Sequence, residues 1–240
     1  MDKKNLDNQI NKWIKKLDQG EQKLLLDESL SLKSIYPFNK YEYQLMYLLD
    51  KKAIIFPEYK ALRDLYINSN PYLYLYKFAP RVFGEIWAQK HLMDSDSRFK
   101  KASTTTDAIY SGEYDLNLIS AKGRIIKIEV KASRAINTKD RAGLDETALS
   151  FNSAEPFWMN FQQIKLKLAD VFIFVGVWAD KILYWVLTEK EVKNHPTISH
   201  QHRGGIEFQI GITDKNIKEF NKYLVPQNKL ADIILKKVKK

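Results

Sequence analysis

Hydrophobic and polar positions alternate along residues 114–120 and partly alternate along 124–131, and this pattern predicts two β-strands. The first segment reads YDLNLIS and the second reads RIIKIEVK, in which β-branched residues are frequent. The residues between them, Ala-Lys-Gly at 121–123, have the chemistry of a short turn. We therefore expect an antiparallel hairpin in which Asn117 faces Lys127 and Asp115 faces Glu129.

The hairpin register decides which side chains share a face. Opposed residues lie about 4.5–5.5 Å apart, and residues two positions apart on a strand point the same way. Asp115, Glu129 and Lys131 therefore share one face, while the apolar residues of the second strand take the other. A register shift of one residue would break this polar cluster, whereas a shift of two would keep it.

The remaining pattern predicts a mixture of helices and strands. Apolar residues at helical spacing, with prolines between the segments, dominate the first 70 residues. Ala79 to Met93 is predicted to be one helix that begins at Pro80, and Phe157 to Ala169 also has helical spacing. The continuous apolar run from Val171 to Trp178 predicts a buried strand. Further strands are predicted at 182–187 and 206–212, a short helix capped by Thr188 at 188–193, and an amphipathic helix at 230–240.

Composition narrows the class of protein. The chain contains no cysteine, which excludes disulfides and thiolate-bound zinc. Its longest apolar run, at 171–178, is far shorter than the roughly 20 residues that span a bilayer, and the polar start MDKKNLDNQI is unlike a signal peptide. A cytoplasmic location is therefore expected.

The charge favours a polyanionic partner. Lys and Arg number 39 against 29 Asp and Glu, which gives a formal net charge of +10 at pH 7. Such a balance suits nucleic acid. The alternative is that a lysine-rich composition reflects an AT-rich genome and has no connection with nucleic acid.

The polar face of the hairpin suits metal-assisted chemistry. Two carboxylates about 5 Å apart repel each other by about 3 kcal/mol at an effective dielectric constant of about 20. Lys131 could neutralise part of this repulsion, and a divalent cation with oxygen ligands would neutralise more. The lysine amine could then hold or help deprotonate an attacking water. The alternative is an exposed hairpin with a cross-strand salt bridge.

Asp115 followed by Glu129-Val130-Lys131 resembles the motif of the PD-(D/E)XK nuclease superfamily, and most of all its type II restriction endonucleases. Members usually have a proline before the first acid, where this chain has Tyr114. The resemblance implies an α/β (α+β) fold with a central mixed sheet flanked by helices. It also implies Mg²⁺ bound by Asp115, Glu129 and the Val130 carbonyl, with Lys131 as a catalytic residue.

The resemblance further implies a glutamate near the metal on the helix before the first acid, and Glu85 is the candidate. On this interpretation residues 76–240 form the catalytic core with a basic tail. Residues 1–75 form a helical region for packing, dimer contact or DNA clamping.

Two polar loops provide candidates for contacts with DNA. The segment 132–146 follows the acidic hairpin directly, and the segment 195–205 contains histidines, an arginine and paired glycines. Arginine can bind phosphates and, bidentately, guanine edges. His200 and His202 lack an obvious third ligand for zinc. The predicted DNA contacts are Ser133, Arg134, Lys139, Arg141, His202 and Arg203.

The function predicted from these features is that of a type II site-specific deoxyribonuclease, which hydrolyses double-stranded DNA at a short sequence with Mg²⁺. Family analogy implies a homodimer, which supplies one site for each strand, and a cognate DNA methyltransferase as a system partner. The alternatives are a repair or structure-selective nuclease of the same superfamily, a DNA-binding protein with a degenerate nuclease core, and a basic protein without a nucleic-acid role.

Overall fold

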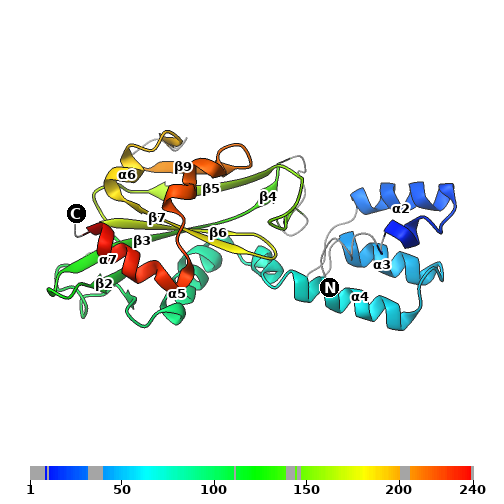
Figure 1. The fold of residues 1–240 in the computed structure, drawn as a ribbon, viewed down its shortest axis with the longest axis horizontal. Coiled ribbons are helices and arrows are strands. Elements are labelled where there is room, and N and C mark those ends of the chain that lie inside the picture. The colour runs from blue at the N-terminus through cyan, green and yellow to red at the C-terminus, as the bar shows by residue number, and fades with distance from the viewer. Residues whose placement is uncertain are drawn as a thin grey trace.

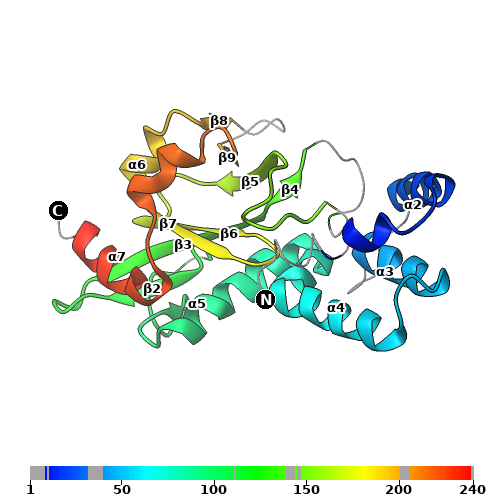
Figure 2. The ribbon, with the colours of Figure 1, turned by 45° about the vertical axis from the view of Figure 1, so that its right-hand side comes forward.

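The computed structural model of this 240-residue chain describes residues 9, 11–31, 40–110, 112–138, 144, 147–200 and 206–238. Figures 1 and 2 show two sheets with helices around them and a group of helices at the N-terminal side. The predicted fold class, a mixed central sheet flanked by helices, is confirmed. Within the described ranges, no helix combines the length and apolar character needed to cross a membrane.

The first sheet has the strand order β1-β2-β3-β6-β7. Strands β2 (Leu116–Ile119) and β3 (Ile125–Arg134) form the predicted hairpin, and β1 (Lys100–Lys101) extends it. Strand β3 runs parallel to β6 (Val171–Val177), which is antiparallel to β7 (Ile182–Thr188). Every residue of β6 is buried, which explains why this strand is a continuous apolar run.

The second sheet has the order β4-β5-β9-β8, and all its pairs are antiparallel. Its strands are β4 (Ile136–Asn137), β5 (Phe157–Ile164), β9 (Phe208–Thr213) and β8 (Ile198–His200). Because β4 follows β3 almost directly, the second sheet begins where β3 ends.

The prediction of a helix from Phe157 to Ala169 is wrong, because most of that segment forms β5. The pairing of β5 with β9 has a register shift between Phe161 and Ile164, which marks an irregularity of the β-bulge kind. The bulge separates these inward-facing residues by three positions, as on a helix, instead of two. The predicted order of acidic hairpin, helix and strand is therefore replaced by acidic hairpin, strands β4 and β5, and then β6.

Hydrophobic cores lie on both faces of the first sheet. One contains the even-numbered residues of β3 and is covered by η2 (Val82–Ala88), α5 (Gln89–Ser95) and α7 (Leu230–Val238), which follows η4 (Gln227–Lys229). The other lies between the two sheets, beside α6 (Glu189–Lys193) and η3 (Ile217–Tyr223). In both views α5 and α7 lie on the side of the first sheet opposite the second sheet (Figures 1 and 2).

Two predicted helix starts are confirmed. Helical backbone begins at Pro80, although its first turns are π-helical, and it continues through α5 to Ser95. The Thr188 hydroxyl accepts a hydrogen bond from the Glu191 N–H and forms a capping box at the start of α6.

The N-terminal helices have a core of their own. They are α2 (Gln19–Ser31), α3 (Lys40–Asp50) and α4 (Phe56–Ser69), and they enclose leucines such as Leu25, Leu45 and Leu48. The 3₁₀ helix η1 (Leu73–Lys77) then leads to the part that contains the sheets. The division into domains at residue 75 stays a prediction.

Candidate active site

The β2–β3 hairpin brings Asp115, Glu129 and Lys131 onto one face. Asn117 is the Cα partner of Lys127, as predicted, and the Asp115 N–H donates to the Ile128 carbonyl at 3.0 Å. Asp115 therefore lies just before β2, at the level of Glu129. The alternation of the sequence is sufficient to give this arrangement.

The Asp115 carboxylate accepts hydrogen bonds at both oxygens. Oδ2 accepts from the Val130 N–H at 2.7 Å, and Oδ1 accepts from Gln89 Nε2 at 2.7 Å. Burial and then the charge of Glu129 raise the pKa of Asp115 to about 6, although the Val130 N–H and Lys131 oppose this shift. The Asp115 anion is thus destabilised in the ion-free protein, and a bound cation would relieve that cost.

Glu129 and Lys131 form a close ion pair. Lys131 Nζ lies 2.7 Å from Glu129 Oε1, and the two side chains are only 15% and 13% exposed. The N–H and C=O groups of one strand residue point to the same edge of the strand. Because the Val130 N–H points to Asp115, the Val130 carbonyl also points to that edge, where β2 has not yet begun.

These groups fit a hard divalent cation. The carboxylates of Asp115 and Glu129 and the Val130 carbonyl form an all-oxygen donor set, which suits Mg²⁺ better than zinc. Burial, and then the charge of Glu129, raise the pKa of Asp115, so the cost of its negative charge is only partly compensated by the protein. Among the described residues, no group of three or more His, Asp or Glu side chains could hold a metal ion. An ion here would complete its shell with water or substrate.

The helix before the hairpin contributes Gln89 to this arrangement. Gln89 is buried and lies where the π-helical η2 passes into α5, and π turns are frequent at functional sites. Glu85 is exposed and accepts a hydrogen bond from Arg81 Nε at 2.7 Å. It acts on Asp115 through space, as the smallest named cause of the raised pKa. The role of Glu85 stays a prediction. Only one feature of the sequence pointed to Gln89, which is its position one turn after Glu85.

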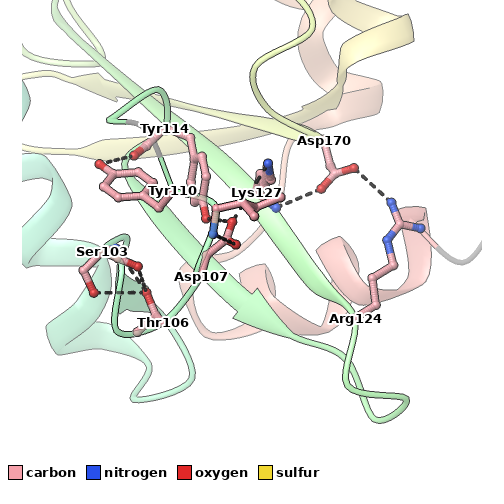
Figure 3. Close-up of polar contacts among 9 residues, drawn as sticks. Ser103, Thr106, Asp107, Tyr110, Tyr114, Arg124, Lys127 and Asp170 are labelled. Carbon is pink, nitrogen blue, oxygen red and sulfur yellow. Dashed lines mark hydrogen bonds and ion pairs between the residues drawn. The ribbon is translucent and has the colours of Figure 1, made fainter.

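The segment before the hairpin contacts Lys127 of β3 through Asp107 and Tyr114 (Figure 3). Tyr114 Oη donates to Asp107 Oδ2 at 2.6 Å, and Lys127 Nζ lies 3.9 Å from that oxygen. The Tyr110 hydroxyl donates to the Tyr114 carbonyl. Burial, and then the charges of Asp115 and Glu129, raise the pKa of Tyr110. Tyr114 thus anchors this segment, which accounts for a tyrosine where the resembled nucleases usually have proline.

The structure buries Arg134, one of the predicted DNA contacts, and its role in DNA binding stays a prediction. Arg134 is 8% exposed, and its guanidinium lies 4.4 Å from the centre of the Phe83 ring. Its Nη1 donates to the carbonyls of Leu75, Tyr76 and Phe78. These carbonyls belong to η1 and the residue after it, so Arg134 ties η1 to the end of β3.

The other predicted DNA contacts are less constrained. The Ser133 hydroxyl accepts a hydrogen bond from the Asn160 N–H at 2.9 Å, which joins β3 to β5. The remaining four, Lys139, Arg141, His202 and Arg203, lie outside the described residues. All five stay predictions.

Comparison with known proteins adds little to this geometry. No protein-family model matches the chain, and no curated protein is significantly similar to it. A solved structure described as a bacterial homing endonuclease, I-Ssp6803I, aligns with a TM-score of 0.36 and 14% sequence identity. The alignment covers 67% of this chain and 97% of that one. At this level of similarity, the inference of function depends on the candidate site.

Proposed function

We propose that the protein is a Mg²⁺-dependent endonuclease of the PD-(D/E)XK type, which hydrolyses phosphodiester bonds of double-stranded DNA at a short recognition sequence. The observation that carries this proposal is the meeting of Asp115, Glu129 and Lys131 on one face of the β2–β3 hairpin. The net charge of +10 supports a nucleic-acid substrate.

Each group of the site has a distinct role. Asp115, Glu129 and the Val130 carbonyl would hold Mg²⁺, which when bound supplies Lewis-acid activation of phosphate and water. Gln89 and the Val130 N–H fix the orientation of the Asp115 carboxylate. Lys131, held at 2.7 Å by Glu129, positions the attacking water and assists the loss of its proton to solvent. As the water oxygen bonds to phosphorus, the P–O bond to the leaving deoxyribose oxygen breaks, and that oxygen takes up a proton from solvent.

The finer proposal is a type II restriction activity. Cutting both strands of a palindrome needs two sites, and a two-fold homodimer supplies them most simply. Such an enzyme works beside a DNA methyltransferase that protects the same sequence in the host. These assignments rest on the resemblance of the site to type II restriction endonucleases.

Incubation of the purified protein with unmethylated phage DNA, in Mg²⁺ and in EDTA, tests the proposal. We expect discrete fragments only with Mg²⁺. Lys131→Ala should reduce cleavage at least about a hundredfold and leave DNA binding intact, since the lysine acts on the attacking water. Lys122→Ala, an exposed lysine in the turn of the same hairpin, is the matched control and should cut normally.

Each other outcome changes the conclusion. Nicking or a smear would favour the repair or structure-selective alternative, and binding without cleavage would indicate a degenerate nuclease core. Full cleavage by Lys131→Ala would remove Lys131 from the mechanism. A protein that neither binds nor cuts DNA would show that the polar face is a structural salt-bridge cluster.

A further inference from the structure

The outward face of the second sheet is polar but uncharged. Strands β5, β9 and β8 contain no Asp, Glu, Lys or Arg, in a chain of which 28% is charged. Their inward residues fill the core between the sheets, and the outward residues that matter here are Trp158, Asn160, Gln162, Ser199, Gln209 and Gly211. The amide groups that this face keeps are of the kind that read base edges through hydrogen bonds.

Two amides on this face are fixed relative to each other. Asn160 Nδ2 donates to Gln209 Oε1 at 3.2 Å, and both side chains are half-buried. Within the described chain, Asn160 Oδ1 and Gln209 Nε2 have no hydrogen-bond partner, so an acceptor and a donor stay available on one surface. An amide acceptor beside an amide donor is the complement of the N6 amino group and N7 atom of adenine.

The strand position that faces Asn160 carries no side chain. Gly211 is the Cα partner of Asn160, so no cross-strand side chain shields the amide. A Cβ atom at Gly211 would meet Trp158 Nε1 at 3.5 Å, an ordinary contact distance, so packing does not require glycine here. Glycine inside a strand often marks the close approach of another molecule.

The strand that carries Asn160 contacts the strand that carries the candidate active site. The Asn160 N–H donates to Ser133 Oγ at 2.9 Å, and Ser133 follows Lys131 by two positions on the same face of β3. The next residues of β5 form the irregularity in which Gln163 has a φ of 55°. Bulges of this kind re-aim side chains and are frequent beside active sites.

We propose that the outward face of β5 and β9 reads base edges of double-stranded DNA, with Asn160 and Gln209 together recognising an adenine. This inference rests on the proposed nuclease function and adds to it the surface that selects the sequence. β-sheets are established elements for reading DNA grooves, and the positive net charge of the chain complements the duplex.

Selection from a pool of random duplexes, followed by cleavage mapping, tests the proposal. The proteins compared are the full chain, Asn160→Ala, Gln209→Ala and, as matched control, Asn228→Ala, an exposed asparagine in η4 on the other side of the first sheet. We expect the two face variants to lose an A·T preference at the same position. Their affinity for the selected duplex should fall about tenfold to a hundredfold, with binding to unrelated duplex unchanged. Asn228→Ala should behave as the full chain does.

A further variant guards against misfolding. Gly211→Ala adds only a Cβ atom that the fold accommodates, so its melting temperature should match that of the parent while its specific binding weakens. If Asn160→Ala cuts the same sites as the parent with the same base preference, the base-reading proposal is overturned, while the nuclease function is unaffected. If light scattering shows that the face variants differ from the parent in molecular mass while their DNA preference is intact, the base-reading proposal is overturned. The face would then be a contact between copies of the chain. A parent chain that neither binds nor cuts DNA overturns both.

Discussion

At the residue scale, the surroundings of Asp115 lower the stability of the ion-free protein in a way that suits a metal ligand. A carboxylate that is buried beside a second acid is a poor structural element, because its charged form is destabilised. Gln89 and the Val130 N–H hold that carboxylate in one orientation nevertheless. An acid that served only in a salt bridge would not require hydrogen bonds that fix the orientation of both its oxygens.

Asp115→Asn is expected to stabilise the ion-free protein. The pKa of Asp115 is about 6 in the folded chain, above the value of about 3.9 expected when unfolded. Ionisation therefore favours unfolding, by about 3 kcal/mol well above pH 6, and the effect vanishes as the pH falls below about 4. Thermal melts in EDTA should show a melting temperature several degrees higher for the variant at pH 8 and no difference near pH 4.

The control for this experiment is Asp214→Asn, at an exposed aspartate far from the hairpin in sequence. It should leave the melting temperature unchanged at both pH values. A variant Asp115→Asn that melts below the parent at pH 8 would contradict the destabilising role assigned to the Asp115 charge.

Gln89→Ala is expected to weaken metal binding and cleavage about tenfold to a hundredfold, as loss of a residue that orients a metal ligand typically does. The reason is that Asp115 Oδ1 would lose its hydrogen bond at 2.7 Å. Calorimetric titration with Mn²⁺ measures the affinity without requiring turnover. Glu85→Ala is the paired comparison, and its effect should be small because Glu85 is exposed and bonded to Arg81. An equal loss of metal affinity in both variants would mean that the hydrogen bond from Gln89 does not specifically orient Asp115.

At the element scale, the hairpin was predictable and the second sheet was not. Partial alternation and a turn sequence predicted the register of β2 and β3, so Asp115 and Glu129 could be paired from the sequence. In β5 the irregularity between Phe161 and Ile164 changes the spacing of apolar residues from two to three, which imitates a helix. The burial of Arg134 could not be predicted from the sequence either, because it depends on the position of η1, whose carbonyls accept its hydrogen bonds.

Gly176→Ala tests how closely the two sheets pack. A Cβ atom at Gly176 in β6 would lie 2.6 Å from Trp185 Cζ3 and 3.0 Å from Met159 Sδ, and both residues are fully buried. Because neither side chain has space to move, we expect Gly176→Ala to lower the free energy of unfolding by about 1–3 kcal/mol. Urea denaturation measures this change. Gly84→Ala in η2 is the control, since a Cβ atom there meets nothing within 4 Å. Unchanged stability of Gly176→Ala would show that the interface between the sheets is loose.

At the scale of the whole molecule, the proposed function assigns different tasks to the net charge and to the amide face. On that proposal, the charge of +10 attracts any duplex, whereas the uncharged face of β5 and β9 distinguishes particular base edges. A protein built in this way should bind unrelated DNA through its cations and selected DNA through its amides as well.

The salt dependence of binding separates these contributions. For Lys131→Ala with unrelated duplex, we expect the logarithm of affinity to fall linearly with the logarithm of salt concentration, with a slope of about −0.9 for each phosphate contact. Asn160→Ala in the same background should keep that slope, because an amide releases no counterions from DNA. Filter binding over a range of potassium chloride concentrations measures both. Affinity that does not respond to salt would mean that the positive charge reflects composition alone, and the cationic part of the proposal would fail independently of the hairpin chemistry.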